Sequence, residues 1–283
     1  MSNLVFEKTV NGINNTEEGI INKLRSDGLV DRQGNLKLDV IEGLKAIGEP
    51  DADDLRTAGA DSVEQVIGTD TRTEVADKSV APYKSIVLLI MKYGNDLYRG
   101  TGFLIKDNVV LTAAHNLYSL DLEKPADEVY IIGEPRDTAH IKTYTGLKVS
   151  VDYVSGGSQG GQHDWGLIKL NDAMTDLGTI NVSRAASVSA SVLDDVLIAG
   201  YPGVAQGRST IDMWEADGSA QYYHASEVMD YTISTSGGNS GSPVMVYYGA
   251  CRVAIGIHVL GSVNANYAKA IDDEVIAAIN EFR

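Results

Sequence analysis

The chain has 283 residues, of which 43% are hydrophobic and 22% are charged, so its composition is that of a globular protein with one large domain or two small ones. Its formal net charge of −16 argues against nucleic acid or an anionic membrane as a partner, because both require a basic face. Cys251 is the only cysteine, so no intramolecular disulfide can form.

The first part of the chain is predicted to be helical. Residues 14–28 combine a capping residue, Asn15 or Thr16, with two glutamates in the first turn and apolar side chains at helical spacing. Residues 35–48 repeat this pattern, and the acidic residues 49–65 are typical of a linker. The beginning of the sequence lacks the basic and then apolar pattern of a secretory signal.

From about Val66 the pattern changes to short apolar or alternating runs, interrupted by Gly, Asn, Asp or Pro. Such runs predict a many-stranded β domain, either a sandwich or a barrel. Residues 266–283 predict a closing helix, because one helical face collects five apolar side chains: Ala268, Ile271, Val275, Ile276 and Ile279.

The stretch TSGGNSGSPV, residues 235–244, surrounds Ser240 with glycines. Such a cluster can be only a tight turn between two strands. The alternative is a nucleophile loop, in which glycines let backbone N–H groups converge close to a reacting atom. Ser240 would then be the nucleophile, and the N–H groups of Gly238 and Ser240 would stabilise the oxyanion.

Two other motifs supply the partners that such a serine needs. His115 follows an apolar run in VVLTAAHN, and Asp164 precedes another in HDWGLIKL. Acyl transfer by a serine requires an imidazole that takes the hydroxyl proton and a carboxylate that orients the imidazole. His163 is an alternative base, but in an extended segment it would point away from the side of Asp164.

These three motifs resemble the signatures of chymotrypsin-like serine peptidases, and they are most similar to the glutamyl endopeptidase branch of staphylococcal V8-type enzymes. The resemblance covers residues 66–283 and implies a mostly β fold with two perpendicular six-stranded β-barrels and a C-terminal helix. It makes Ser240 the nucleophile, His115 the general base and acid, and Asp164 the orienting carboxylate. Residues 1–65 occupy the propeptide position of that family.

The resemblance also implies a pocket for an acidic side chain at P1, the substrate residue before the cleaved bond. Trypsin-like enzymes place an aspartate where this chain has Ser234, so a basic P1 residue would have no counter-charge. V8-type enzymes bind the acidic group with a threonine and a histidine, which correspond here to Thr235 and His258. A free α-amino group near Val66 would complete the pocket, and Gly261 would hydrogen-bond the extended substrate.

The motif around His258 departs from the family because Val259 and Leu260 replace the Trp-Gly pair that often follows this histidine. The subsites beyond P1 can therefore differ. A glutamate-specific enzyme could cut after Glu64, which would leave Gln65 as the new first residue, one position before the family register.

The sequence therefore predicts a serine endopeptidase that acts on proteins or peptides after Glu or Asp and is made as an inactive precursor. The resemblance implies a secreted enzyme, and we expect a monomer that uses no metal or other cofactor and binds neither nucleic acid nor membranes. Two alternatives remain open: a peptidase of the same fold with a non-acidic P1 preference, and a non-catalytic binding module. A binding module would have no need for all three residues of the triad.

Overall fold

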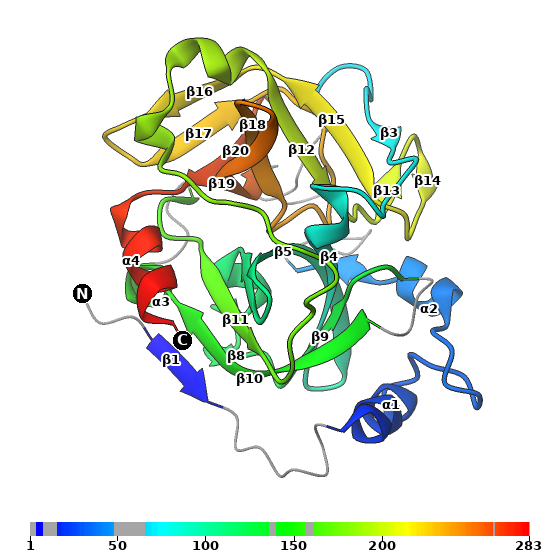
Figure 1. Cartoon of the computed structure of the whole chain (residues 1–283). Coiled ribbons are helices and arrows are strands. Elements are labelled where there is room, and N and C mark those ends of the chain that lie inside the picture. The colour runs from blue at the N-terminus through cyan, green and yellow to red at the C-terminus, as the bar shows by residue number, and fades with distance from the viewer. Residues whose placement is uncertain are drawn as a thin grey trace.

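The structure is a computed structural model, and it describes residues 4–7, 16–47, 66–135, 140–156, 161–262 and 264–282. It consists of two β bodies, one above the other in Figure 1, with short helices at their periphery. The predicted mostly β, chymotrypsin-like fold is confirmed, but only the first body is the closed six-stranded barrel that was expected of both.

Six antiparallel strands form the first body, a closed barrel within the described part of the chain. The ring closes because β9 pairs with both β4 and β10. In ring order the strands are β4 (Ile86–Tyr93), β5 (Asp96–Lys106), β6 (Val109–Thr112), β11 (Gly166–Leu170), β10 (Ile141–Val149) and β9 (Glu128–Ile132). A small hairpin, β7 (Tyr118–Ser119) and β8 (Lys124–Pro125), follows β6 in the chain, and α3 (Val151–Gly156) follows β10.

The second body is an open, curved half-barrel whose sheet has eight strands among the described residues. In sheet order they are β16 (Ala220–Tyr223), β17 (Val228–Tyr231), β20 (Asn266–Ala270), β19 (Cys251–Gly261), β18 (Pro243–Tyr248), β12 (Val196–Gly200), β15 (Trp214–Gly218) and β3 (Thr73–Glu74). A separate hairpin pairs β13 (Val204–Ala205) with β14 (Arg208–Ser209).

The N-terminal segment contains strands as well as helices. Thr16 caps α1 (Glu17–Ser26), since its side chain accepts from the backbone N–H of Gly19 at 3.1 Å. The second helix, α2 (Leu38–Glu42), is shorter than expected, because the chain leaves it to form β2 (Lys45–Ala46), which runs parallel to β5.

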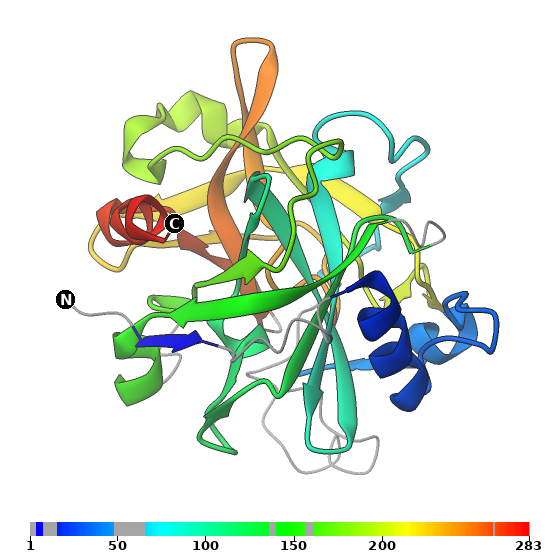
Figure 2. The same ribbon diagram turned by 60° about the horizontal axis from the view of Figure 1, so that its bottom comes forward.

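A further strand at the start of the chain, β1 (Leu4–Glu7), was not predicted. It pairs antiparallel with β10 and so extends the first barrel, as Figure 2 shows beside the long green strand. Four residues carry too little periodicity to predict a strand, and the free edge of β10 decides their conformation.

The N-terminal segment shares a hydrophobic core with the barrel. Leu24, Leu29 and Ile41 are fully buried in the same cluster as barrel side chains. Asp27 forms an ion pair with Lys92 of β4 and accepts from the Tyr130 hydroxyl of β9 at 2.6 Å. The segment is thus built into the first barrel, whereas the predicted linker, with Glu64 and Gln65, lies outside the described residues.

The predicted closing helix is confirmed as α4 (Asp273–Glu281), capped by Asp272, whose side chain accepts from the N–H of Val275 at 2.9 Å. The predicted start of this helix at residue 266 is wrong, however, because residues 266–270 form strand β20 between β17 and β19. Ala268 is fully buried there, so strand pairing overrides its helical propensity. Among the described residues, every helix is too short or too polar to cross a membrane.

Candidate active site

His115 and Asp164 meet because their strands are neighbours in the first barrel. His115 lies in a 3-10 helix directly after β6, and Asp164 lies two residues before β11, which runs antiparallel to β6. The carboxylate of Asp164 holds the histidine at two points, with 2.7 Å from Oδ2 to ring Nδ1 and 3.0 Å from Oδ1 to the backbone nitrogen. The Asp164 side chain is only 2% exposed and that of His115 is 16% exposed, so the ring keeps access to solvent.

The loop around Ser240 requires glycine at two positions. Gly238 has φ +100°, and a Cβ there would lie 2.6 Å from the carbonyl oxygen of Tyr201. Gly241 has φ +90°, and a Cβ there would lie 2.0 Å from the carbonyl oxygen of Thr101. Both positive angles and both close approaches exclude a side chain, so the glycine cluster is a specific backbone shape rather than a loose turn.

Asn116 joins the histidine segment to the serine loop. Its side-chain amide donates to the carbonyl oxygen of Ser240 at 2.9 Å and to the Thr112 hydroxyl at 3.0 Å. The backbone N–H of Thr101 donates to the same carbonyl at 2.9 Å. Two donors from the first barrel therefore fix Ser240 of the second body. Asn116 was not predicted from the sequence, because its role depends on a contact between two segments far apart in the chain.

Two of the predicted pocket residues lie beside this loop. Thr235 is fully buried, and its Oγ1 has no hydrogen-bond partner among the residues that the structure describes. His258 lies on β19, where its backbone carbonyl accepts from Gly241 at 2.7 Å and its N–H donates to Ser242 at 2.9 Å. A buried hydroxyl in that position is suited to an incoming polar group.

Tyr231 is a further residue that sequence reasoning missed. Its hydroxyl lies 2.6 Å from Nδ1 of His258, and its side chain is 4% exposed. Nothing in the sequence connects position 231 with position 258, because the contact between Tyr231 and His258 reaches across the strand between them.

Gly261, which was predicted to hydrogen-bond the substrate, ends β19 opposite Asn266.

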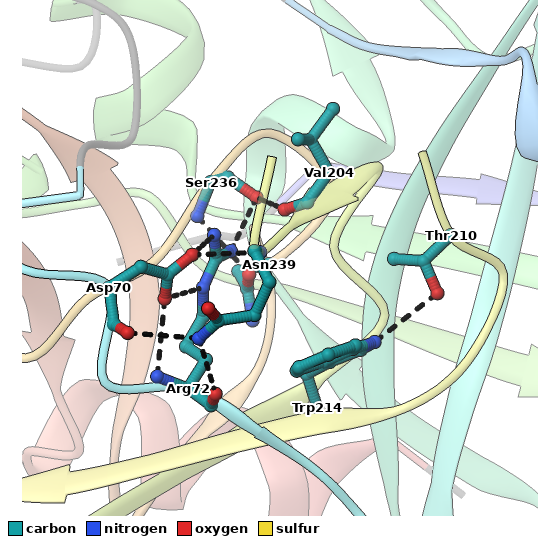
Figure 3. A network of polar contacts seen from close by, with 8 residues as sticks. Asp70, Arg72, Val204, Thr210, Trp214, Ser236 and Asn239 are labelled. Carbon is teal, nitrogen blue, oxygen red and sulfur yellow. Dashed lines mark hydrogen bonds and ion pairs between the residues drawn. The ribbon is translucent and has the colours of Figure 1, made fainter. Parts of the chain in front are cut away.

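Residues 70–72 are anchored on the same loop, as Figure 3 shows. Arg72 is 4% exposed, and it donates to the Ser236 hydroxyl at 2.7 Å and twice to Asp70, at 2.9 and 2.7 Å. The side-chain hydrogen bonds from Arg72 lower the pKa of Asp70 to about 2. Asn239 closes the network by accepting from the N–H of Ser236 at 3.3 Å. The side chain of Val66 is 37% exposed. The chain a few residues after Val66 is attached to the Ser240 loop through the contact between Arg72 and Ser236.

His163 makes different contacts from its neighbour Asp164. Its Nδ1 lies 3.7 Å from Oε2 of Glu274 on α4. With Asp152 these side chains place three potential ligand atoms within 4.8 Å of one another, a geometry that could accept a metal ion. The sequence did not predict this group.

Residues 100–255 match the family of trypsin-like peptidase domains, and the chain belongs to this family. It is 31% identical over 222 residues to a protein named extracellular metalloprotease from Bacillus subtilis, a match that covers 74% of this chain and 67% of that protein. It is 26% identical over 233 residues to the glutamyl endopeptidase of Bacillus licheniformis, covering 78% of this chain and 70% of the relative.

Solved structures give the same fold. A Glu endopeptidase in complex with MPD superposes with a TM-score of 0.65 at 27% identity, covering 76% of this chain and 97% of that one. The protease Anisep from Arthrobacter nicotinovorans superposes with a TM-score of 0.58 at 18% identity, over 71% of this chain and 95% of that one, and this likeness supports the fold alone. The family and its relatives make the chain a serine endopeptidase.

Proposed function

We propose that this serine endopeptidase cleaves after glutamate, or aspartate, with Ser240, His115 and Asp164 as its triad. The observation that carries the proposal is the link between the two bodies. Asp164 orients His115 at 2.7 Å, and Asn116, the next residue, holds the backbone of Ser240 at 2.9 Å. The same short segment thus positions both the base and the nucleophile.

The chemistry follows from these positions. The Ser240 hydroxyl attacks the carbonyl carbon of the substrate while His115 accepts its proton and later transfers it to the leaving amine. Asp164 keeps Nδ1 of His115 as the donor nitrogen, which leaves Nε2 to accept the proton, and it stabilises the imidazolium that forms. The N–H groups of Gly238 and Ser240 stabilise the oxyanion of the tetrahedral intermediate.

The pocket chemistry favours an acidic P1 side chain. Burying a carboxylate costs several kcal/mol unless charged or polar groups satisfy it. The Thr235 hydroxyl can donate to it, and an imidazole N–H of His258 can donate as well. Ser234 gives no counter-charge for a basic side chain. The relatives named glutamyl endopeptidase support this preference.

A free amine at Val66 would add a cation to this pocket, and that cation is absent while residue 65 is still bonded to Val66. We therefore propose that the chain is a precursor that becomes active when it is cut between them. An α-amino group is largely protonated at neutral pH, so it can pair with the substrate carboxylate. An extracellular site of action is part of the same proposal, in line with the name of one relative.

The pocket can be tested with the variants Thr235→Val and His258→Ala in the cut chain. We expect each variant to lower kcat/KM for a peptide with Glu at P1 far more than for one with Leu, because a site built to hydrogen-bond a substrate group discriminates strongly through that bond. Thr145→Val, on β10 of the first barrel, is a matched control that removes a hydroxyl outside the pocket. Equal losses for both substrates would show that neither pocket residue reads P1.

A further inference from the structure

The contact between Tyr231 and His258 is short and protected from water. Strands β17 and β19 flank β20, and the tyrosine reaches across β20 to the histidine ring. The hydroxyl lies 2.6 Å from Nδ1, the ring centroids are 5.9 Å apart, and His258 is fully buried. A buried polar contact of this length is costly to break, so it fixes the orientation of the imidazole.

We propose that Tyr231 is a positioning residue for substrate specificity, which makes His258 present its Nε2–H to the acidic side chain of the substrate. The inference rests on the proposed function, since it assumes that His258 contacts the P1 carboxylate. It adds a reason why a neutral histidine can act as a donor in that pocket.

Neutral imidazole has two tautomers. One ring nitrogen carries the proton and donates, whereas the other carries a lone pair and accepts. The hydrogen-bond partner of one nitrogen decides which tautomer is present. A phenol keeps its proton at neutral pH, and in the proposed arrangement the Tyr231 hydroxyl donates that proton to Nδ1, 2.6 Å away. The proton of the neutral ring then lies on Nε2.

The same tyrosine also suits the charged ring. In an imidazolium both nitrogens carry protons, and the phenolic oxygen can then accept from Nδ1 instead of donating to it. His258 therefore presents Nε2–H in either protonation state. With the opposite tautomer, Nε2 would direct a lone pair toward the substrate carboxylate, and the interaction would be repulsive.

The test compares Tyr231→Phe with the wild-type protein, both as the cut chain. Removing the hydroxyl lets the ring adopt both tautomers, so we expect kcat/KM for Glu at P1 to fall about tenfold or more, mainly through a higher KM. For Leu at P1 we expect a change of less than about threefold. Tyr222→Phe is the matched control, because Tyr222 lies on β16 and its hydroxyl contacts Glu227 instead of the histidine.

A spectroscopic measurement tests the tautomer of His258 directly, without relying on catalytic activity. Nitrogen-15 NMR of histidine-labelled protein distinguishes Nδ1–H from Nε2–H, and the five histidines can be assigned by single substitutions. The Ser240→Ala background prevents self-cleavage during the measurement. We expect Nε2–H for His258 in the protein with Tyr231 intact and a mixture of tautomers in Tyr231→Phe.

Two results would overturn the inference: a proton on Nδ1 of neutral His258 in the parent protein, or an unchanged ratio of Glu to Leu cleavage in Tyr231→Phe. The proposed function fails separately. If His258→Ala retains the preference for Glu, the histidine does not read P1 at all. If His258→Ala loses that preference while Tyr231→Phe keeps it, the pocket stands and only the role of Tyr231 is refuted.

Discussion

Asp164 and Asn116 show how single residues convert a sequence motif into a geometry. Asp164 fixes His115 through both the ring and the backbone, and Asn116 fixes Ser240 through its carbonyl oxygen. The order His, Asp, Ser along the sequence predicted a triad, and the structure brings His115 and Asp164 into contact. That order could not predict Asn116, because a buried amide bridging two segments 124 residues apart leaves no periodic pattern.

The first prediction concerns the nucleophile. Ser240→Ala in the cut chain should lose nearly all peptidase activity and keep its fold, because oxyanion stabilisation alone gives only about 10³–10⁴ over water. An organophosphonate should label Ser240 in the parent protein, and mass spectrometry would locate the label. His115→Ala should abolish the labelling, whereas labelling at the parent rate would show that His115 is not the base.

The second prediction concerns Asp70, which pairs with the buried Arg72 beside the serine loop. Its pKa lies at about 2 in the folded chain, mainly because of the side-chain hydrogen bonds from Arg72, against an ordinary value of 3.8. A lowered folded pKa stabilises the protein fully above the ordinary value, and that contribution is lost progressively as the pH falls from 3.8 to about 2. Asp70→Asn should therefore lower the free energy of unfolding by about 2 kcal/mol at neutral pH.

Urea denaturation of the Ser240→Ala background at pH 6, 4 and 3 would measure this difference. It should be slightly smaller at pH 4 than at pH 6 and should fall by roughly half at pH 3, because the unfolded chain begins to bind the proton near its ordinary pKa. Asp77→Asn is a control, because Asp77 is exposed and bonds only its own turn at Ser79 among the contacts described. A difference at Asp70 that grows on acidification would contradict the assigned charge pair.

At the scale of elements, strand runs and capped helices were predictable where a local pattern was strong. Thr16 at α1 and the short apolar runs of the barrel strands are examples. The sequence missed β1, β2 and the start of β20, all of which are short and owe their conformation to a partner strand. Tertiary pairing overrides propensity in such segments, so no local pattern could have indicated them.

The third prediction follows from the packing of the N-terminal segment. Since α1, α2, β1 and β2 all pack on or pair with the first barrel, a cut before Val66 should leave the segment bound rather than release it. Native size-exclusion chromatography followed by mass spectrometry should find both pieces in one peak. Two separate native peaks would instead indicate a propeptide that dissociates.

Leu24 offers a way to weaken this association. Its side chain is fully buried, so Leu24→Ala should cost about 2–5 kcal/mol and release the segment at a lower urea concentration. Leu122→Ala is a matched control, since Leu122 is 55% exposed. Equal urea midpoints for the two variants would contradict the role of the segment in the core.

At the scale of the whole molecule, the proposed site draws on both bodies and on the stretch that follows Val66. The first barrel supplies His115 and Asp164, and the second supplies Ser240, Thr235 and His258. The stretch after Val66 is attached to the second body through the contact between Arg72 and Ser236. A new chain terminus at Val66 would therefore arise close in sequence to residues anchored on the serine loop.

The most direct measurement uses the full chain with a controllable cut. Four substitutions after Asp61, namely Ser62→Asp, Val63→Asp, Glu64→Asp and Gln65→Lys, create an enterokinase site that exposes the amine of Val66. The cut protein is incubated with a peptide library, and the products are sequenced by mass spectrometry. The uncut protein, a version with Met inserted before Val66 and the Ser240→Ala variant are the controls. We predict that the cut protein cleaves after Glu, that the uncut protein and the version with the inserted Met cleave little, and that Ser240→Ala does not cleave. Comparable cleavage after Leu, full activity of the uncut chain or activity that persists in Ser240→Ala would contradict this prediction.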